Sequence, residues 1–152
     1  MKDKVFTVII PTYNRSHLVL ETLDSLIEQT YRPIEIILID DGSTDNTNEV
    51  VENWKMINDD DIKLSICIIY QKNMGPSAAR NRGIQESSGA YILFLDSDDK
   101  LYPQCLEIFV AAFKSRKADL IICGYDIFDD YTGQIKKKVF GRPDESQIEL
   151  VL

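Results

Sequence analysis

Short apolar runs alternate with segments of helical periodicity along most of the chain. The apolar runs have the length of buried strands and span Val5–Ile10, Ile34–Ile39, Lys63–Tyr70, Ala90–Leu95 and Leu120–Gly124. We expect the first strand to stop at Pro11, because proline cannot donate a backbone hydrogen bond. Runs that are apolar at successive positions predict strands covered on both faces, as in parallel sheets.

Amphipathic helices are predicted between these strands. They occupy Leu18–Gln29, a segment around Val50–Ile57, Pro76–Glu86 and a segment that opens at Pro103. Strands that alternate with helices predict an α/β fold, in which a mostly parallel sheet is flanked by helices. Such sheets bind their ligands beyond the carboxyl ends of the strands.

The C-terminal part of the chain departs from this alternation. Asp126–Asp130 and Ile135–Phe140 flank the turn residues Thr132 and Gly133, which predicts a hairpin. Residues 143–152 have the pattern of a helix start without an end. We therefore expect one α/β domain over residues 1–125, and over residues 126–152 a hairpin and helix start that lead into a missing part of a longer protein.

Four polar segments follow predicted strands and carry most of the candidate chemistry. They are Pro11–Asn14, Asp40–Asp45, Asn73–Gly75 and Asp96–Asp99. Loops at the same edge of one sheet would build one pocket. The carboxylates among them would repel one another there unless they were solvated, protonated or bound to a cation.

Asp96 and Asp98 are the candidate ligands of a divalent cation. They lie two residues apart in a segment expected to be extended, so their side chains point the same way. Carboxylate oxygens select hard cations such as Mg²⁺, Mn²⁺ or Ca²⁺. The spacing alone is weak support, because acidic turns after strands also serve as caps or solvated loops. The residues also leave two roles open for Tyr13, base stacking or core packing, and two for Arg80, a phosphate contact or a surface position.

Charge and composition narrow the classes of function. The net charge of −8 over 152 residues disfavours a nucleic-acid partner, and a cation would reconcile it with an anionic ligand. Cys67, Cys105 and Cys123 form no closely spaced pair and each lies in an apolar stretch, which predicts buried free thiols. Neither a P-loop nor a dinucleotide-binding glycine pattern is present. The start does not resemble a signal peptide, and no apolar run reaches the ~20 residues of a membrane span, so we expect a cytoplasmic location.

Taken together, the ordered segments resemble glycosyltransferase family 2, the inverting enzymes of the GT-A fold. The matching stretches are Val8–Asn14, Ser25–Leu26 with Gln29–Tyr31, Glu35–Asp45, Asn73–Ile84 and Gly89–Asp99. The specificity comes from the ordered set rather than from any one motif. The resemblance implies a GT-A-like fold that is truncated at its C-terminus in this chain.

The resemblance also implies a site for a nucleoside-diphosphate sugar. The nucleotide-sugar-binding residues that it implies are Pro11, Thr12, Tyr13, Asn14, Asp41, Asn73, Gly75, Arg80, Asp96 and Ser97. Asp41 would accept a hydrogen bond from a uracil-type N–H. Asp96 would face ribose or metal, and Asp98 would bind Mn²⁺ or Mg²⁺ directly.

The implied reaction transfers a sugar from the diphosphate, with UDP as the expected nucleotide, to a hydroxyl of a saccharide or lipid-linked acceptor, with inversion. Such transfers build polysaccharides, glycolipids and cell-surface glycans. The cation would stabilise the leaving diphosphate, and the general base is expected beyond Leu152, in the acceptor-binding part. Peripheral association with the inner face of the membrane through missing regions stays open.

Two alternative functions remain at this point. A sugar nucleotidyltransferase on a related fold would carry a glycine-rich basic loop where this chain has Pro11–Asn14. A non-catalytic nucleotide-binding module would need no general base.

Overall fold

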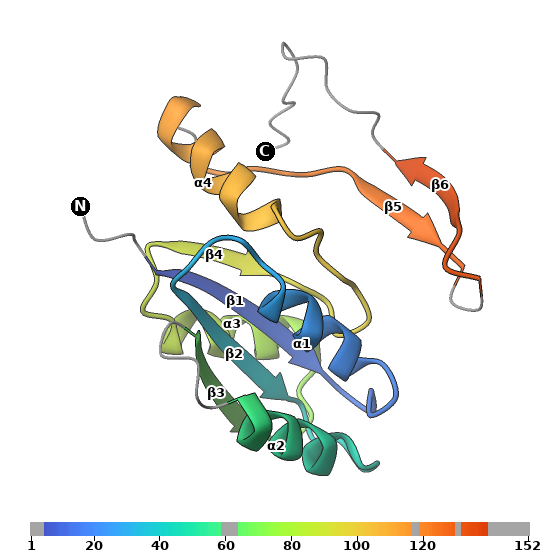
Figure 1. The fold of residues 1–152 in the computed structure, drawn as a ribbon. Helices are drawn as coiled ribbons and strands as arrows, with labels where there is room; N and C mark the ends of the chain where they lie inside the picture. Colours follow the sequence, from blue (N-terminus) through green and yellow to red (C-terminus); the bar gives the residue numbers. More distant parts are fainter. Residues whose placement is uncertain (1–4, 59–63, 117–118, 130–131, 140–152) are drawn as a thin grey trace. The chain divides into compact units, whose positions relative to one another are not determined.

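The computed structural model describes residues 5–58, 64–116, 119–129 and 132–139 (Figure 1). The chain forms two compact units, Met1–Glu107 and Ile108–Leu152, which are described separately. The predicted division after residue 125 concerns functional domains and stays a prediction.

The first unit contains a four-stranded parallel sheet. Its strands are β1 (Phe6–Thr12), β2 (Ile34–Asp40), β3 (Leu64–Tyr70) and β4 (Tyr91–Phe94), in the order β3-β2-β1-β4. Each neighbouring pair is parallel, so the carboxyl ends of all four strands lie at one edge. The predicted α/β fold is confirmed.

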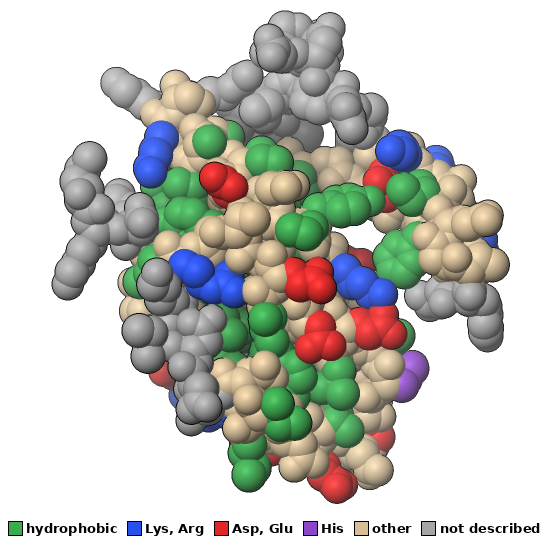
Figure 2. All heavy atoms as spheres, viewed as in Figure 1, with side chains coloured by type: hydrophobic (Ala, Val, Ile, Leu, Met, Phe, Trp, Pro, Cys, Tyr) green, Lys and Arg blue, Asp and Glu red, His purple; other side chains and the backbone are tan. Residues whose placement is uncertain are grey.

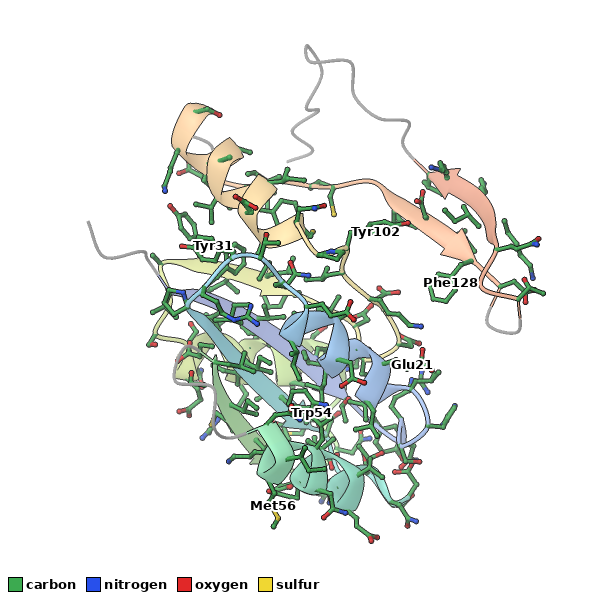
Figure 3. All side chains as sticks on the ribbon, viewed as in Figure 1. Glu21, Tyr31, Trp54, Met56, Tyr102 and Phe128 are labelled. Carbon is green, nitrogen blue, oxygen red and sulfur yellow. The ribbon has the colours of Figure 1, made fainter. Side chains whose placement is uncertain are left out.

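Helices cover both faces of this sheet. These helices are α1 (Val19–Ile27), α2 (Thr47–Asn58) and α3 (Pro76–Glu86). A further helix, α4 (Cys105–Arg116), begins at the end of the first unit. In Figure 1, α1 and α2 lie in front of the sheet and α3 lies behind it. Trp54 lies between α1 and α2 and donates its indole N–H to Asp24 at 2.7 Å, whereas Met56 points away from both helices (Figure 3).

The core lies at the two central strands, β1 and β2. Every residue of β1 is buried, as is every residue of β2 except Glu35. On the α3 side, Ala79 packs against Ile37 and Ile39. Gly83 lets α3 approach β1 closely, because a Cβ at this position would lie 2.3 Å from Cγ2 of Ile9. This packing holds the N-terminal end of α3 at the same edge as the carboxyl ends of the strands.

The predicted stop of the first strand at Pro11 is wrong, because β1 continues to Thr12. Along β1, the backbone N–H and C=O groups of successive residues point in turn to the two neighbouring strands. The Thr12 carbonyl accepts from Asp41 on the β2 side, and the Ile9 carbonyl accepts from Leu95 on the β4 side. Pro11 therefore faces the β4 side, where β4 has already ended at Phe94. Its missing N–H removes no hydrogen bond of the sheet.

The predicted strand at Leu120–Gly124 is also wrong. This stretch has no regular secondary structure, and Leu120 and Ile122 are 48% and 45% exposed. An apolar run becomes a strand only where a neighbour completes its backbone hydrogen bonds. In the described part of the second unit, the pair that forms is instead β5 (Tyr125–Phe128) with β6 (Ile135–Val139).

The second unit carries the predicted hairpin. Strands β5 and β6 are antiparallel, and Gly133 lies at the turn with φ of +66°. The Gly133 N–H donates to the Asp129 carbonyl at 2.8 Å. The helix start expected at residues 143–152 lies outside the described residues. The three cysteines are free, as predicted, but the prediction that they are buried is wrong, because Cys67 and Cys123 are exposed and Cys105 is only partly buried. Among the described residues, no helix has both the length and the apolar character needed to cross a membrane.

Candidate functional site

A pocket of about 550 Å³ opens at the carboxyl edge of the first unit's sheet. This volume lies within the range of roughly 300–1,000 Å³ that is typical of small-molecule sites. The predicted site residues that line it are Pro11, Thr12, Tyr13, Asp41, Asn73, Gly75, Arg80, Asp96, Ser97 and Asp98. Arg15 and Pro76 also line the pocket. The parallel order of the strands thus gathers four loops that are distant in sequence.

Asp41 is a buried part of this pocket, with only 4% of its surface exposed. Its Oδ1 accepts hydrogen bonds from Gln71 Nε2 at 2.7 Å and from the Met74 N–H at 2.9 Å, and its Oδ2 accepts one from the Gly75 N–H at 2.7 Å. A carboxylate offers about four acceptor sites, so Oδ2 keeps one for a ligand N–H. Asp41 both holds the loop after β3 and retains capacity to bind.

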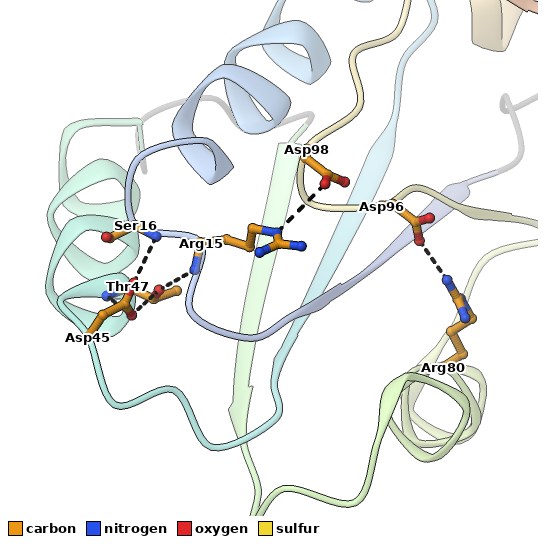
Figure 4. Close-up of polar contacts among 7 residues, drawn as sticks. All are labelled: Arg15, Ser16, Asp45, Thr47, Arg80, Asp96 and Asp98. Carbon is orange, nitrogen blue, oxygen red and sulfur yellow. Dashed lines mark hydrogen bonds and ion pairs between the residues drawn. The ribbon is translucent and has the colours of Figure 1, made fainter.

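Asp96 and Asp98 follow β4, and each carboxylate faces an arginine (Figure 4). Arg80 Nη2 lies 2.6 Å from Asp96 Oδ1, and Arg15 Nε lies 3.7 Å from Asp98 Oδ2. Ser97 between them is buried, whereas both aspartate side chains are about half exposed. Exposed ion pairs of this kind contribute little to stability. Both carboxylates can therefore exchange their arginine for another partner at small cost.

The crowding of carboxylates at this edge affects Asp99. Desolvation by partial burial raises its pKa, and the neighbouring charges of Asp96 and Asp98 raise it further. Elsewhere on the molecule, Figure 2 shows acidic side chains interspersed with basic ones on the face that carries α1 and α2. The segment after β4 is thus a place where additional positive charge would relieve repulsion.

The donor set fits a hard divalent cation that is shared with a ligand. Among the described residues, no group of three or more His, Cys, Asp or Glu side chains is arranged to hold a metal ion. Asp96 and Asp98 supply two carboxylates at the pocket wall. Mg²⁺ is usually bound through one or two carboxylates, with water and substrate phosphates in its other positions.

Asn14 has a different position from the other predicted residues, because it does not line the pocket. Its φ is +51°, a conformation that asparagine tolerates better than most residues. Its Oδ1 accepts from the Thr44 N–H at 2.8 Å, and its own N–H donates to Ser43 Oγ at 2.9 Å. Asn14 thereby joins the loop after β1 to the loop after β2, and its nucleotide-binding role stays a prediction.

Arg15 and Pro76 are the two residues lining this pocket that sequence reasoning missed, and Arg15 is the one that carries a charge. Arg15 follows directly on the polar segment Pro11–Asn14, and this position together with its positive charge is the sequence feature that could have identified it. The sequence could not show that Arg15 lies beside Asp98, which is far away along the chain.

A family model described as Glycosyl transferase family 2 matches residues 7–149. The chain belongs to glycosyl transferase family 2. The family 2 chain is 35% identical over 139 residues to the glycosyltransferase GlyA of Streptococcus pneumoniae serotype 4. It is 34% identical over 141 residues to GlyG of the same organism. These matches cover 91% and 92% of the chain but only 19% of GlyA and 45% of GlyG, so the chain spans less than half of either relative.

Solved glycosyltransferase structures share the fold. S. aureus TarS 1–349 in complex with UDP-GlcNAc has a TM-score of 0.67 and 32% identity, with 75% of this chain and 32% of TarS covered. The mannosyltransferase PcManGT from Pyrobaculum calidifontis, in complex with GDP-Man and Mn²⁺, has a TM-score of 0.63 and 26% identity, with 85% and 37% covered. The expected GT-A-like fold and the resemblance to family 2 are both confirmed.

Proposed function

We propose that this chain is the nucleotide-sugar-binding part of a metal-dependent glycosyltransferase. In the proposed reaction a sugar moves with inversion from a UDP-linked donor to a hydroxyl of a saccharide or lipid-linked acceptor. The observation that carries the proposal is the pocket itself. It combines a buried, hydrogen-bonding carboxylate at Asp41 with two exposed carboxylates and two arginines on its wall.

The nucleotide would be held on the β1–β2 side of the pocket. Asp41 has one acceptor site left for a base N–H, which suits the N3–H of uracil. Tyr13 lines the pocket and is 45% exposed, so its ring is available for stacking on a base rather than used in the core. TarS forms complexes with UDP and UDP-GlcNAc, whereas PcManGT forms one with GDP-Man, so relatives differ in the base they bind.

The diphosphate would lie at the opposite wall. Asp96 and Asp98 would hold a divalent cation, which neutralises charge on the leaving diphosphate when bound. The PcManGT complex contains Mn²⁺ together with its sugar nucleotide, which supports this assignment. Arg80, at the first turns of α3, points its guanidinium at Asp96 and is placed to bind a phosphate oxygen.

The acceptor site and the general base stay predictions for the whole protein. The relatives are longer, since the chain spans 19% of GlyA and 45% of GlyG. The cytoplasmic location and a peripheral contact with the membrane stay predictions for the whole protein.

Calorimetric titration with UDP, in the presence of Mn²⁺ and in its absence, tests the proposal. We expect Mn²⁺-dependent binding by the natural sequence. Asp98→Ala should lower the affinity at least about ten-fold, the lower range of the effect that even outer partners of metal ligands have. Glu86→Ala is the matched control, because Glu86 is an exposed acid paired to Arg82 away from the pocket.

The outcomes separate the candidate functions. A natural-sequence chain that binds UDP equally well without metal, or not at all, would contradict the proposal. Preference for UTP together with a sugar 1-phosphate would indicate a nucleotidyltransferase. Metal-dependent UDP binding, combined with no consumption of any UDP-sugar by the full-length protein, would indicate a binding module.

A further inference from the structure

The Arg15 guanidinium is loosely held, although it lines the pocket. Its Nε lies 3.7 Å from Asp98 Oδ2, well beyond the 2.7–2.9 Å or so of a charge-assisted hydrogen bond. Within the described residues, this ion pair is the only interaction that the guanidinium makes. By contrast, Arg80 is in full hydrogen-bond contact with Asp96 at 2.6 Å. Most of the hydrogen-bond donors of Arg15 are therefore available to a ligand in the pocket.

The Arg15 backbone, in contrast, is held on both sides. Its N–H donates to Thr47 Oγ1 at 2.9 Å, and its carbonyl accepts from the Leu18 and Val19 N–H groups at the start of α1. The Thr47 hydroxyl in turn donates to Asp45 Oδ1 at 2.5 Å, and the next residue, Ser16, donates its N–H to Asp45 Oδ2 at 3.2 Å. Figure 4 shows this chain of contacts between the two loops.

A fixed backbone with a loosely paired side chain suits a residue that changes its anionic partner. We propose that Arg15 neutralises Asp98 in the donor-free protein and binds the donor diphosphate when a cation occupies Asp98, and that Thr47 and Asp45 position it. The inference rests on the proposed function. A cation at Asp98 would repel the guanidinium, while a diphosphate offers paired oxygens that match the planar fork of arginine.

The proposal predicts effects of opposite sign when Arg15 is removed. Without nucleotide, Arg15 competes with a cation for Asp98, so Arg15→Ala should tighten Mn²⁺ binding about two- to five-fold, the equivalent of an exposed ion pair. With Mn²⁺ present, Arg15 binds the diphosphate, so the same variant should weaken UDP binding about ten-fold or more. A residue that only stabilises the loop would lower both affinities.

The experiment measures Mn²⁺ binding alone and UDP binding at saturating Mn²⁺ for the natural sequence, Arg15→Ala and Arg15→Lys. Arg15→Lys should be intermediate for UDP, because lysine keeps the charge but not the paired donors. Arg82→Ala is the control, since Arg82 is an exposed arginine paired to Glu86 outside this pocket. Losses in both titrations, or no change in either, for Arg15→Ala would refute the proposal.

The positioning role has its own test. Thr47→Val removes the hydroxyl but keeps the shape of the buried side chain, so UDP affinity should fall while Mn²⁺ binding alone does not weaken. Thr47→Ser keeps the hydroxyl and should restore UDP affinity. Failure of Thr47→Ser to restore it, with folding intact by circular dichroism, would contradict the positioning role. Absence of Mn²⁺-dependent UDP binding by the natural sequence would instead refute the proposed function and this inference together.

Discussion

Two acidic regions line the same pocket and are held in different ways. Asp41, at the end of β2, is buried and accepts three hydrogen bonds, two of them from backbone N–H groups. Asp96 and Asp98, after β4, are about half exposed, and among the described residues their carboxylates pair only with arginine side chains. Backbone donors cannot move away without unfolding the loop, whereas arginine side chains can. The first region is therefore part of the fold, and the second is available for exchange with ligands.

The largest effect should come from removing the buried carboxylate. Asp41→Ala would leave the Gln71, Met74 and Gly75 donors without their acceptor, so we expect the free energy of unfolding to fall by about 3 kcal/mol. Asp96→Ala is the comparison, and it should change the same quantity by no more than about 1 kcal/mol, because its ion pair is exposed. Urea denaturation measures both. An equal decrease in the free energy of unfolding for Asp41→Ala and Asp96→Ala would contradict the proposal that only the first region stabilises the fold.

A smaller effect should come from the loop that Asp41 holds. Gly75 has φ of +87° and ψ of +163°, a conformation nearly restricted to glycine. A Cβ there would meet no neighbour within 4 Å, so Gly75→Ala isolates the backbone strain, which should cost about 1–3 kcal/mol. Ser77→Ala, at an exposed position two residues later, should stay within about 0.5 kcal/mol. Thermal denaturation measures both variants. An equal change in stability for Gly75→Ala and Ser77→Ala would contradict the assignment of backbone strain to position 75.

The smallest effect concerns Asp45, which joins the loops after β1 and β2. Desolvation acts to raise its pKa, but hydrogen bonds from Thr47 and Ser16 outweigh it and lower the pKa to about 2 from 3.8. Because the folded pKa is depressed, the stabilisation is present above about pH 4 and is lost as the pH falls toward 2. The difference in unfolding midpoint between the natural sequence and Asp45→Asn should therefore shrink over this interval. A difference that stays constant from pH 5 to pH 2 would contradict the assignment.

Much of the fold could be predicted from the chain alone. The runs around β1 to β4 have the length and apolar composition of buried parallel strands, and these are properties of neighbouring residues. The failures came where a distant partner decides the outcome. Leu120–Gly124 has the composition of a strand but is not paired as one. Pro11 remains within β1 only because β4 is short.

The same division holds for the candidate site. The sequence by itself determined which polar segments follow the strands. The parallel order then brings residues of all four segments to one pocket, and among the predicted site residues only Asn14 does not line it. Only the tertiary structure decided that most of the acceptor capacity of Asp41 is used by donors in the loop after β3, and that Arg15 faces Asp98. The type of each residue and the local periodicity of apolar residues can be read directly from the sequence. Its burial and its charged partner depend on loops that meet only when the sheet has formed.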